Sequence, residues 1–92
     1  MKIIKKSVAG TLESSDCMIS VEPNKENKVV IDIESIVYDQ YGDAILKAAQ
    51  QVVDEMNVEN AFISIHDRGA YDCVIGARME AALLRACEGG KN

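Results

Sequence analysis

Two neighbouring serines between carboxylates are the residues of this sequence best suited to chemistry. Residues 13–16 read Glu-Ser-Ser-Asp and follow a stretch rich in Gly, Ser and Thr, which favours an exposed connecting segment. Neither Ser14 nor Ser15 has a neighbouring base that would make its hydroxyl a nucleophile. The segment therefore suits a hydroxyl that another enzyme modifies, although a turn or capping role is the plainer interpretation of these residues alone.

The single histidine, His66, stands next to Asp67, and a histidine beside a carboxylate is a familiar acid-base arrangement. Adjacent residues of a strand point to opposite faces, however, so this spacing predicts a surface position for His66 at a strand end. Residues 67–69 could form an anion-binding turn before a helix, but no glycine-rich phosphate loop accompanies them. A turn stabilised by Asp67, with Gly69 at positive φ, is the favoured interpretation.

Two further groups of residues have a structural and a functional interpretation. Arg78, Glu80 and Arg85 share a predicted helix and could form a docking face, but this spacing is more typical of a solvated helix side. Tyr38 and Tyr41 lie three residues apart, which predicts one helix face at the partly buried edge of a core. The side chains therefore predict no catalytic centre.

The cysteines and the charge exclude several classes of protein. Cys17, Cys73 and Cys87 have no metal-binding spacing, so we interpret them as small apolar residues and expect no metal site. The formal net charge of −5 disfavours nucleic acid and suits basic patches on partner proteins, or solubility alone. Residues 1–6 lack the apolar run of a signal peptide and no window resembles a membrane span, which predicts a cytoplasmic protein.

The first half of the chain predicts two strands and a helix. Polar and apolar residues alternate from Asp16 to Glu22, and a β-branched run follows over residues 29–33, after the turn at residues 23–27. We expect these two strands to pair as an antiparallel hairpin. Ser35 is the expected N-cap of a helix that extends to Met56, although Gly42 interrupts the helical pattern.

The second half predicts a strand and a second helix. Residues 58–65 form the strand, which a parallel crossover would place beside its predecessor, and the helix covers residues 71–87. Its expected buried stripe consists of Ile75, Met79, Ala82, Leu83 and Ala86. The predicted fold is α+β, a two-layer sandwich of about three strands and two helices in the order β-β-α-β-α.

The length of 92 residues predicts a single domain, residues 1–92, with one aliphatic core. Residues 1–15 show neither the strand nor the helix period and are expected to form an exposed N-terminal segment that carries the serines. Residues 88–92, after the last helix, are expected to form a loose tail.

Four short segments spread over most of the chain form a specific set. They read Val-Ala-Gly-Thr-Leu-Glu-Ser-Ser-Asp at 8–16, Tyr-Gly-Asp-Ala-Ile at 41–45, Asp-Arg-Gly-Ala-Tyr-Asp-Cys at 67–73 and Ala-Arg-Met-Glu-Ala at 77–81. This set resembles the citrate lyase acyl carrier protein family, also called the gamma subunit, over residues 8 to about 87. Tyr71 departs from the pattern, since an aliphatic residue is common at that position.

The resemblance implies a non-catalytic carrier subunit with Ser14 as its modified residue. In that family the matching serine holds 2′-(5″-phosphoribosyl)-3′-dephospho-coenzyme A through a phosphodiester, and the arm's thiol carries acetyl and citryl thioesters. The implied partners are the alpha subunit, an acyl transferase, and the beta subunit, a citryl lyase, which together cleave citrate to acetate and oxaloacetate. A prosthetic-group transferase and an acetate ligase that loads the thiol complete the set. Ser15 is the alternative attachment site.

Two other functions stay open at this level. The carriers of citramalate lyase and malonate decarboxylase resemble the same family and use the same type of prosthetic group, so the motifs report the arm rather than the acyl group. A metabolite-binding or scaffolding domain without covalent modification is also compatible with the composition and topology. That last alternative predicts an unmodified Ser14.

Overall fold

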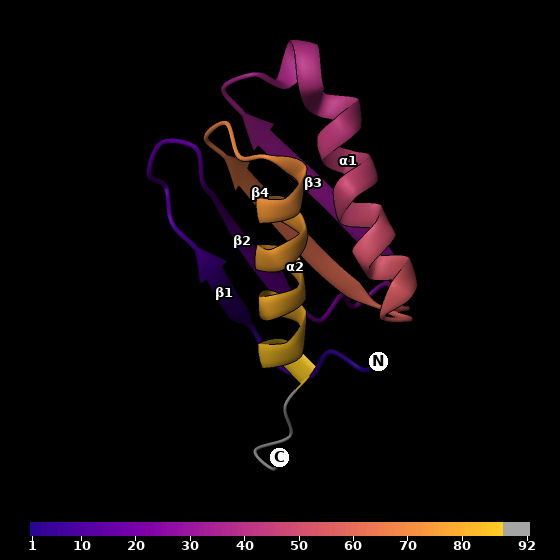
Figure 1. Ribbon diagram of the computed structural model, residues 1–92. Coiled ribbons are helices and arrows are strands. Elements are labelled where there is room, and N and C mark those ends of the chain that lie inside the picture. Colours follow the sequence, from indigo (N-terminus) through magenta and orange to yellow (C-terminus); the bar gives the residue numbers. More distant parts are fainter. Residues whose placement is uncertain (88–92) are drawn as a thin grey trace.

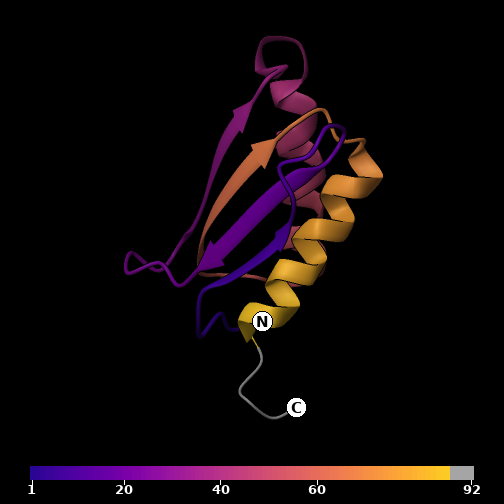
Figure 2. The same cartoon turned by 90° about the vertical axis from the view of Figure 1, so that its left-hand side faces the viewer.

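The computed structural model describes residues 1–87, which form a four-stranded sheet with two helices on one of its faces (Figures 1 and 2). This architecture confirms the α+β class and the two layers. The expected tail at residues 88–92 lies outside the described residues. The elements, in chain order, are β1 (Ser7–Gly10), β2 (Cys17–Glu22), β3 (Val29–Ser35), α1 (Tyr38–Glu55), β4 (Ala61–Asp67) and α2 (Asp72–Cys87).

The sheet order is β1-β2-β4-β3, so the predicted hairpin between the second and third strands is wrong. β4 lies between them, antiparallel to β2 and parallel to β3, as the predicted crossover through α1 requires. β4 buries every second residue and bonds to a strand on both edges, which makes it the natural centre of the sheet. The short link between β2 and β3 suggested that these two strands pair with each other. Each of them pairs instead with β4, which lies further along the chain.

β1 is a strand that the sequence did not predict. Its four residues pair with β2 from Ser7, opposite Val21, to Gly10, opposite Met18. Only Ala9 is buried in β1, so the segment is too short to show the period of two. The exposed N-terminal segment expected over residues 1–15 is therefore partly ordered into the sheet.

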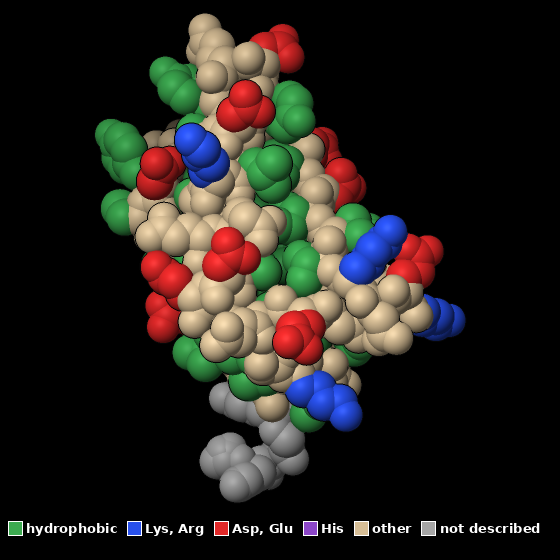
Figure 3. All heavy atoms as spheres, turned by 90° about the vertical axis from the view of Figure 1, so that its right-hand side faces the viewer, with side chains coloured by type: hydrophobic (Ala, Val, Ile, Leu, Met, Phe, Trp, Pro, Cys, Tyr) green, Lys and Arg blue, Asp and Glu red, His purple; other side chains and the backbone are tan. Residues whose placement is uncertain are grey.

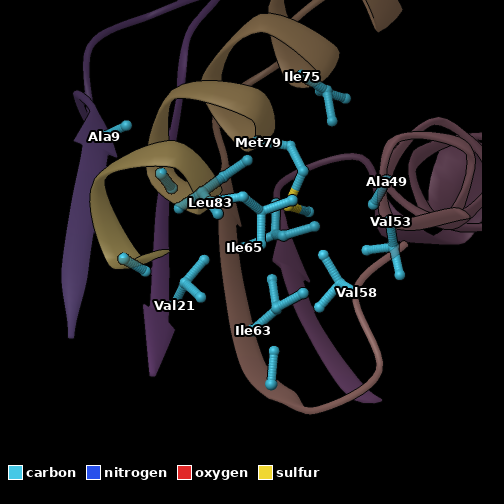
Figure 4. Close-up of a cluster of buried hydrophobic side chains, with 14 of the residues drawn as sticks. Ala9, Val21, Ala49, Val53, Val58, Ile63, Ile65, Ile75, Met79 and Leu83 are labelled. Carbon is cyan, nitrogen blue, oxygen red and sulfur yellow. The ribbon is translucent and has the colours of Figure 1, made fainter. Parts of the chain in front are cut away.

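The core lies between the sheet and the helices (Figure 4). β2 and β4 turn alternate residues toward it, as their alternating patterns predicted, and the whole predicted stripe of α2 is buried. The buried strand and helix residues that form its centre are Cys17, Ile19, Val21, Ala61, Ile63, Ile65, Ile75, Met79, Ala82, Leu83 and Ala86. Both helices therefore have fixed positions over one face of the sheet.

α1 begins at Tyr38, later than predicted, because Ser35 remains part of β3 and pairs with Asp67. Val37 occupies the N-cap position, without a side-chain hydrogen bond. Tyr38 and Tyr41 are 52% and 55% exposed, so their predicted place at the edge of the core is wrong. The residues that α1 turns inward are Gly42, Ile45, Ala49 and Val53.

Two glycines have a positive φ, but only one of them also lacks room for a side chain. Gly10 has φ of 95° and Gly69 has φ of 90°. A Cβ at Gly10 would overlap the carbonyl oxygen of Cys17, whereas a Cβ at Gly69 would meet no atom within 4 Å. Gly10→Ala therefore adds an overlap to the same backbone strain.

We expect Gly69→Ala to lower the free energy of unfolding by about 1 kcal/mol, the cost of a left-handed alanine, and Gly10→Ala to lower it by distinctly more. Urea unfolding of the two variants and the wild-type chain measures the difference. Equal losses would contradict the close approach of Gly10 to Cys17.

Candidate functional site

The predicted serine segment lies in the loop that joins β1 to β2, at the end of the sheet where β3 and β4 also end (Figure 1). We call residues 11–16 the serine loop. The amide of Asp16 donates to the carbonyl of Glu13 at 3.1 Å, which closes a tight turn with Ser14 and Ser15 in its two central positions. Ser15 has φ of 66°, which lies in the left-handed region that a type II turn requires at its third position. Both serines are exposed.

Asp16 holds the serine loop through four hydrogen bonds to its carboxylate. Arg78 of α2 donates from Nε to Oδ1 at 3.0 Å and from Nη2 to Oδ2 at 2.8 Å. The Thr11 hydroxyl donates to Oδ2 at 2.7 Å, and the Cys17 amide donates to Oδ1 at 2.7 Å. A two-bond contact with a guanidinium fixes direction as well as distance, so both ends of the loop are tied to α2.

These bonds shift the acid-base behaviour of both partners. The Arg78 hydrogen bonds, followed by those from Thr11 and the Cys17 amide, hold the pKa of Asp16 well below its usual value of 3.8. The hydrogen bond to Asp16 in turn raises the pKa of Arg78. Asp16 is therefore a permanently charged acceptor at neutral pH, suited to holding the loop rather than to exchanging protons.

A second connection joins the serine loop to the turn between β4 and α2. The Ser15 amide donates to the carbonyl of Arg68 at 2.8 Å, and the Arg68 amide donates to the carbonyl of Asp16 at 2.9 Å. These two backbone bonds extend the pairing of β2 and β4 beyond the strand ends. The loop that carries the serines and the turn at Arg68 consequently form one surface.

Asp67 organises that turn from inside the protein. It is 2% exposed, and its carboxylate accepts from the Ser35 hydroxyl at 2.8 Å and from the amides of Gly69 and Ala70 at 3.1 and 3.0 Å. These contacts confirm the turn-stabilising interpretation of Asp67 and the positive φ of Gly69. They also join the end of β3 to the turn before α2. A buried carboxylate needs such donors, because buried polar groups are almost always hydrogen-bonded.

His66 lies on the opposite face from Asp67, as predicted, and the two residues form no dyad. Its side chain is 45% exposed, and its Nδ1 lies 3.2 Å from Oε1 of Glu34. Cys17 is fully buried, and desolvation, with the nearby charges of Asp16 and Asp67, raises the pKa of its thiol to about 11. The Cys17 thiol is therefore neutral and packed in the core, as its apolar interpretation required.

A groove of about 600 Å³ opens beside this surface, between the first turns of α1 and the β4–α2 turn. We call it the tyrosine groove because the exposed rings of Tyr41 and Tyr71 line it, over a floor that includes Val37, Ile45 and Ala70. No cluster of three His, Cys, Asp or Glu side chains that could hold a metal ion occurs within residues 1–87. Among the helices of that range, none has the length and apolarity needed to cross a membrane.

Comparison with known proteins gives a family for this chain. The family described as Malonate decarboxylase delta subunit (MdcD) matches residues 4–86. The citrate lyase acyl carrier protein of Clostridium perfringens is 47% identical over 88 residues, which cover 96% of this chain and 87% of that protein. Citrate lyase acyl carrier protein 2 of Salmonella paratyphi A is 46% identical, with 96% and 91% of the two chains covered. The chain belongs to the citrate lyase acyl carrier protein family.

The fold also matches that of a solved structure. A chain in the crystal structure of a Pseudomonas malonate decarboxylase hetero-tetramer in complex with malonate has a TM-score of 0.79. The match covers 89% of this chain and 84% of that one, at 22% sequence identity, and shows a shared fold. Acyl carrier proteins are non-catalytic and hold a covalently attached prosthetic group, so family membership confirms the prediction that this chain is a carrier rather than an enzyme.

Arg78 is the site residue that the sequence did not identify, because its spacing was read as a solvated helix side. Its partner Asp16 lies 62 positions away, so no local pattern connects them. A signal existed, since Asp16 and Arg78 both fall inside the segments that resemble the family. Glu80 and Arg85 are exposed, as predicted, although Arg85 also donates to the carbonyl of Val8 at 2.8 Å.

We expect Arg78→Gln to loosen the serine loop without unfolding the core, because it removes both guanidinium bonds to Asp16. Hydrogen exchange at the amides of Ser15, Asp16 and Cys17 should become several-fold faster, while exchange in β4 stays unchanged. Arg85→Gln is the matched control on the same helix. Equal acceleration in both variants would show that Arg78 has no special role in the loop.

The loop should also resist acid. Because the pKa of Asp16 is lowered by folding, its contribution to stability is present above 3.8, the usual value, and is lost as the pH falls through the lower folded value. The NMR shift of the Asp16 side-chain carboxyl carbon should stay constant down to 3.8 and change only at lower pH. In Arg78→Gln the transition should move up toward 3.8; a wild-type midpoint already at that value would refute the arrangement.

Proposed function

We propose that this chain is the acyl carrier subunit of a citrate lyase complex, with 2′-(5″-phosphoribosyl)-3′-dephospho-coenzyme A attached to Ser14. The observation that carries the proposal is an exposed serine at a tight turn whose flanking residues are held by Asp16 and Arg68. An enzyme that modifies Ser14 can reach its hydroxyl from solvent, while the loop presents that hydroxyl in a fixed place. The family membership supports the same assignment.

Ser14 is the better candidate than Ser15 for a reason of backbone geometry. The Ser15 amide is bonded to Arg68, and its left-handed φ of 66° commits Ser15 to shaping the turn. Ser14 occupies the preceding position of the turn. Neither a bond to Arg68 nor a left-handed φ constrains Ser14. The resemblance of residues 8–16 to the family motif also supports Ser14 as the modified serine.

The residues around Ser14 fit an attached phosphodiester. The hydroxyl lies in an exposed loop with room for a bulky group, and the exposed Arg68 is the residue bonded to that loop. Arg68 forms no ion pair within residues 1–87, so its guanidinium is available to the phosphate charge. When bound, the group supplies a long arm whose terminal thiol carries acyl groups as thioesters.

The chain itself contributes attachment, orientation and surfaces for its partners. An acyl group that is tethered to the carrier has an effective concentration of roughly millimolar at each partner site, as expected for short flexible links. We infer that the partners are the alpha acyl transferase, the beta citryl lyase, the prosthetic-group transferase and the acetate ligase. Residues 1–92 would act as one carrier domain in the cytoplasm, and the net charge of −5 suits basic patches on those partners.

A malonate decarboxylase carrier is the second candidate, favoured by the family description and by the solved structure. The identity of 44 to 47% with citrate lyase carriers from Clostridium perfringens and Vibrio cholerae favours citrate instead. The acid that the assembled complex cleaves, measured with citrate, citramalate and malonate in turn, separates these candidates.

Mass spectrometry of the Ser14 peptide tests the attachment site. We expect protein from its native host, grown on citrate, to carry a phosphoribosyl dephospho-coenzyme A adduct on the Ser14 peptide. Ser14→Ala should lose the adduct and all carrier activity. Ser15→Gly is the matched control, because glycine accepts the positive φ at that position and should leave modification intact.

Two results would contradict the proposal. Loss of the adduct in Ser15→Gly with retention in Ser14→Ala would move the attachment to Ser15. An unmodified wild-type chain under citrate growth would favour the alternative of a metabolite-binding domain without covalent modification.

A further inference from the structure

We propose that the tyrosine groove is a binding site for the adenine base of the prosthetic arm, which would rest there while the arm is not engaged by a partner enzyme. This inference rests on attachment of the arm to Ser14. It assigns a ligand to a groove that neither the fold nor the attachment chemistry explains.

The shape and lining of the groove suit a flat, partly polar ring. Its volume of about 600 Å³ is within the range of small-molecule sites, roughly 300–1,000 Å³. Tyr41 and Tyr71 are 55% and 75% exposed, and both line the groove. Aromatic side chains that are open to solvent form stacking platforms for nucleic-acid bases.

The composition of the groove also favours a base over a phosphate. Val37, Ile45 and Ala70 supply an apolar floor, and Asp72 lies exposed among the lining residues. The carboxylate of Asp72 would repel a phosphate but can accept a hydrogen bond from the exocyclic amine of adenine. Asp67, the other acidic lining residue, already accepts three bonds from Ser35, Gly69 and Ala70.

The groove lies within reach of Ser14. The Ser15 amide is 2.8 Å from the carbonyl oxygen of Arg68, and Tyr71 is three residues further along the same turn. Consecutive Cα atoms are about 3.8 Å apart, so Arg68 and Tyr71 are separated by at most about 11 Å. Arg68, between the serine and the groove, is placed to meet the phosphates of an arm that follows this path.

The exposed face in Figure 3 is consistent with a ligand site near the start of α1. Hydrophobic side chains there are open to solvent among scattered Asp and Glu side chains. The serine loop, the β4–α2 turn and the start of α1 lie at one end of the molecule (Figure 1). A base tethered at Ser14 therefore meets this groove at high effective concentration.

The test uses the modified carrier, with the adduct on Ser14 first verified by mass. We expect NMR to show nuclear Overhauser contacts between the adenine H2 or H8 proton and the rings of Tyr41 or Tyr71. The adenine protons should also shift upfield relative to the same protein unfolded in urea. Tyr41→Leu and Tyr71→Leu should each reduce this shift.

Tyr38→Leu is the matched control, because Tyr38 is 52% exposed on the same helix but is not among the residues that line the groove. It should keep the adenine shift unchanged. Adenine signals that match the unfolded protein in a verified adduct would overturn the inference and leave the attachment to Ser14 intact. An equal loss of the adenine shift in all three variants would also overturn the inference. The same holds if the tyrosine signals respond to an added lyase subunit but not to the arm.

Discussion

The charged contact between Asp16 and Arg78 is the interaction on which the presentation of the serine loop depends. It joins a loop between two strands to a helix that lies 62 positions further along the chain. Because the carboxylate also accepts from Thr11 and from the Cys17 amide, one ionised side chain holds both ends of the loop. With the arm attached at Ser14, as proposed, a fixed loop suits the carrier, because the mobility belongs to the arm and the partners must find the attachment point.

A buried carboxylate at the neighbouring strand end completes the support. Asp67 joins β3 to the β4–α2 turn, and the backbone of that turn bonds in both directions to the serine loop. Three connections that are distant in sequence therefore share one end of the sheet. This end of the protein offers an exposed hydroxyl, a nearby cation and an aromatic groove, while in the proposed function the chemistry belongs to partner enzymes.

Much of the fold followed from local pattern. Alternation over residues 16–22 and 58–65 predicted β2 and β4, and the stripe from Ile75 to Ala86 predicted the buried face of α2. The predicted hairpin failed because any two strands of suitable pattern can pair, and local spacing does not reveal a third strand that will lie between them. β1 was missed because four residues with one buried position show no measurable period.

The sequence by itself determined the class of fold and the core faces, and its resemblance to a family of carriers pointed to Ser14 as the attachment site that we propose. Only the tertiary structure decided which residues hold Ser14 in place and that Tyr41 and Tyr71 share a groove near it. The reason is physical: burial periodicity is a property of neighbouring residues, whereas an ion pair such as Asp16–Arg78 depends on how strands and helices pack, which no local spacing encodes.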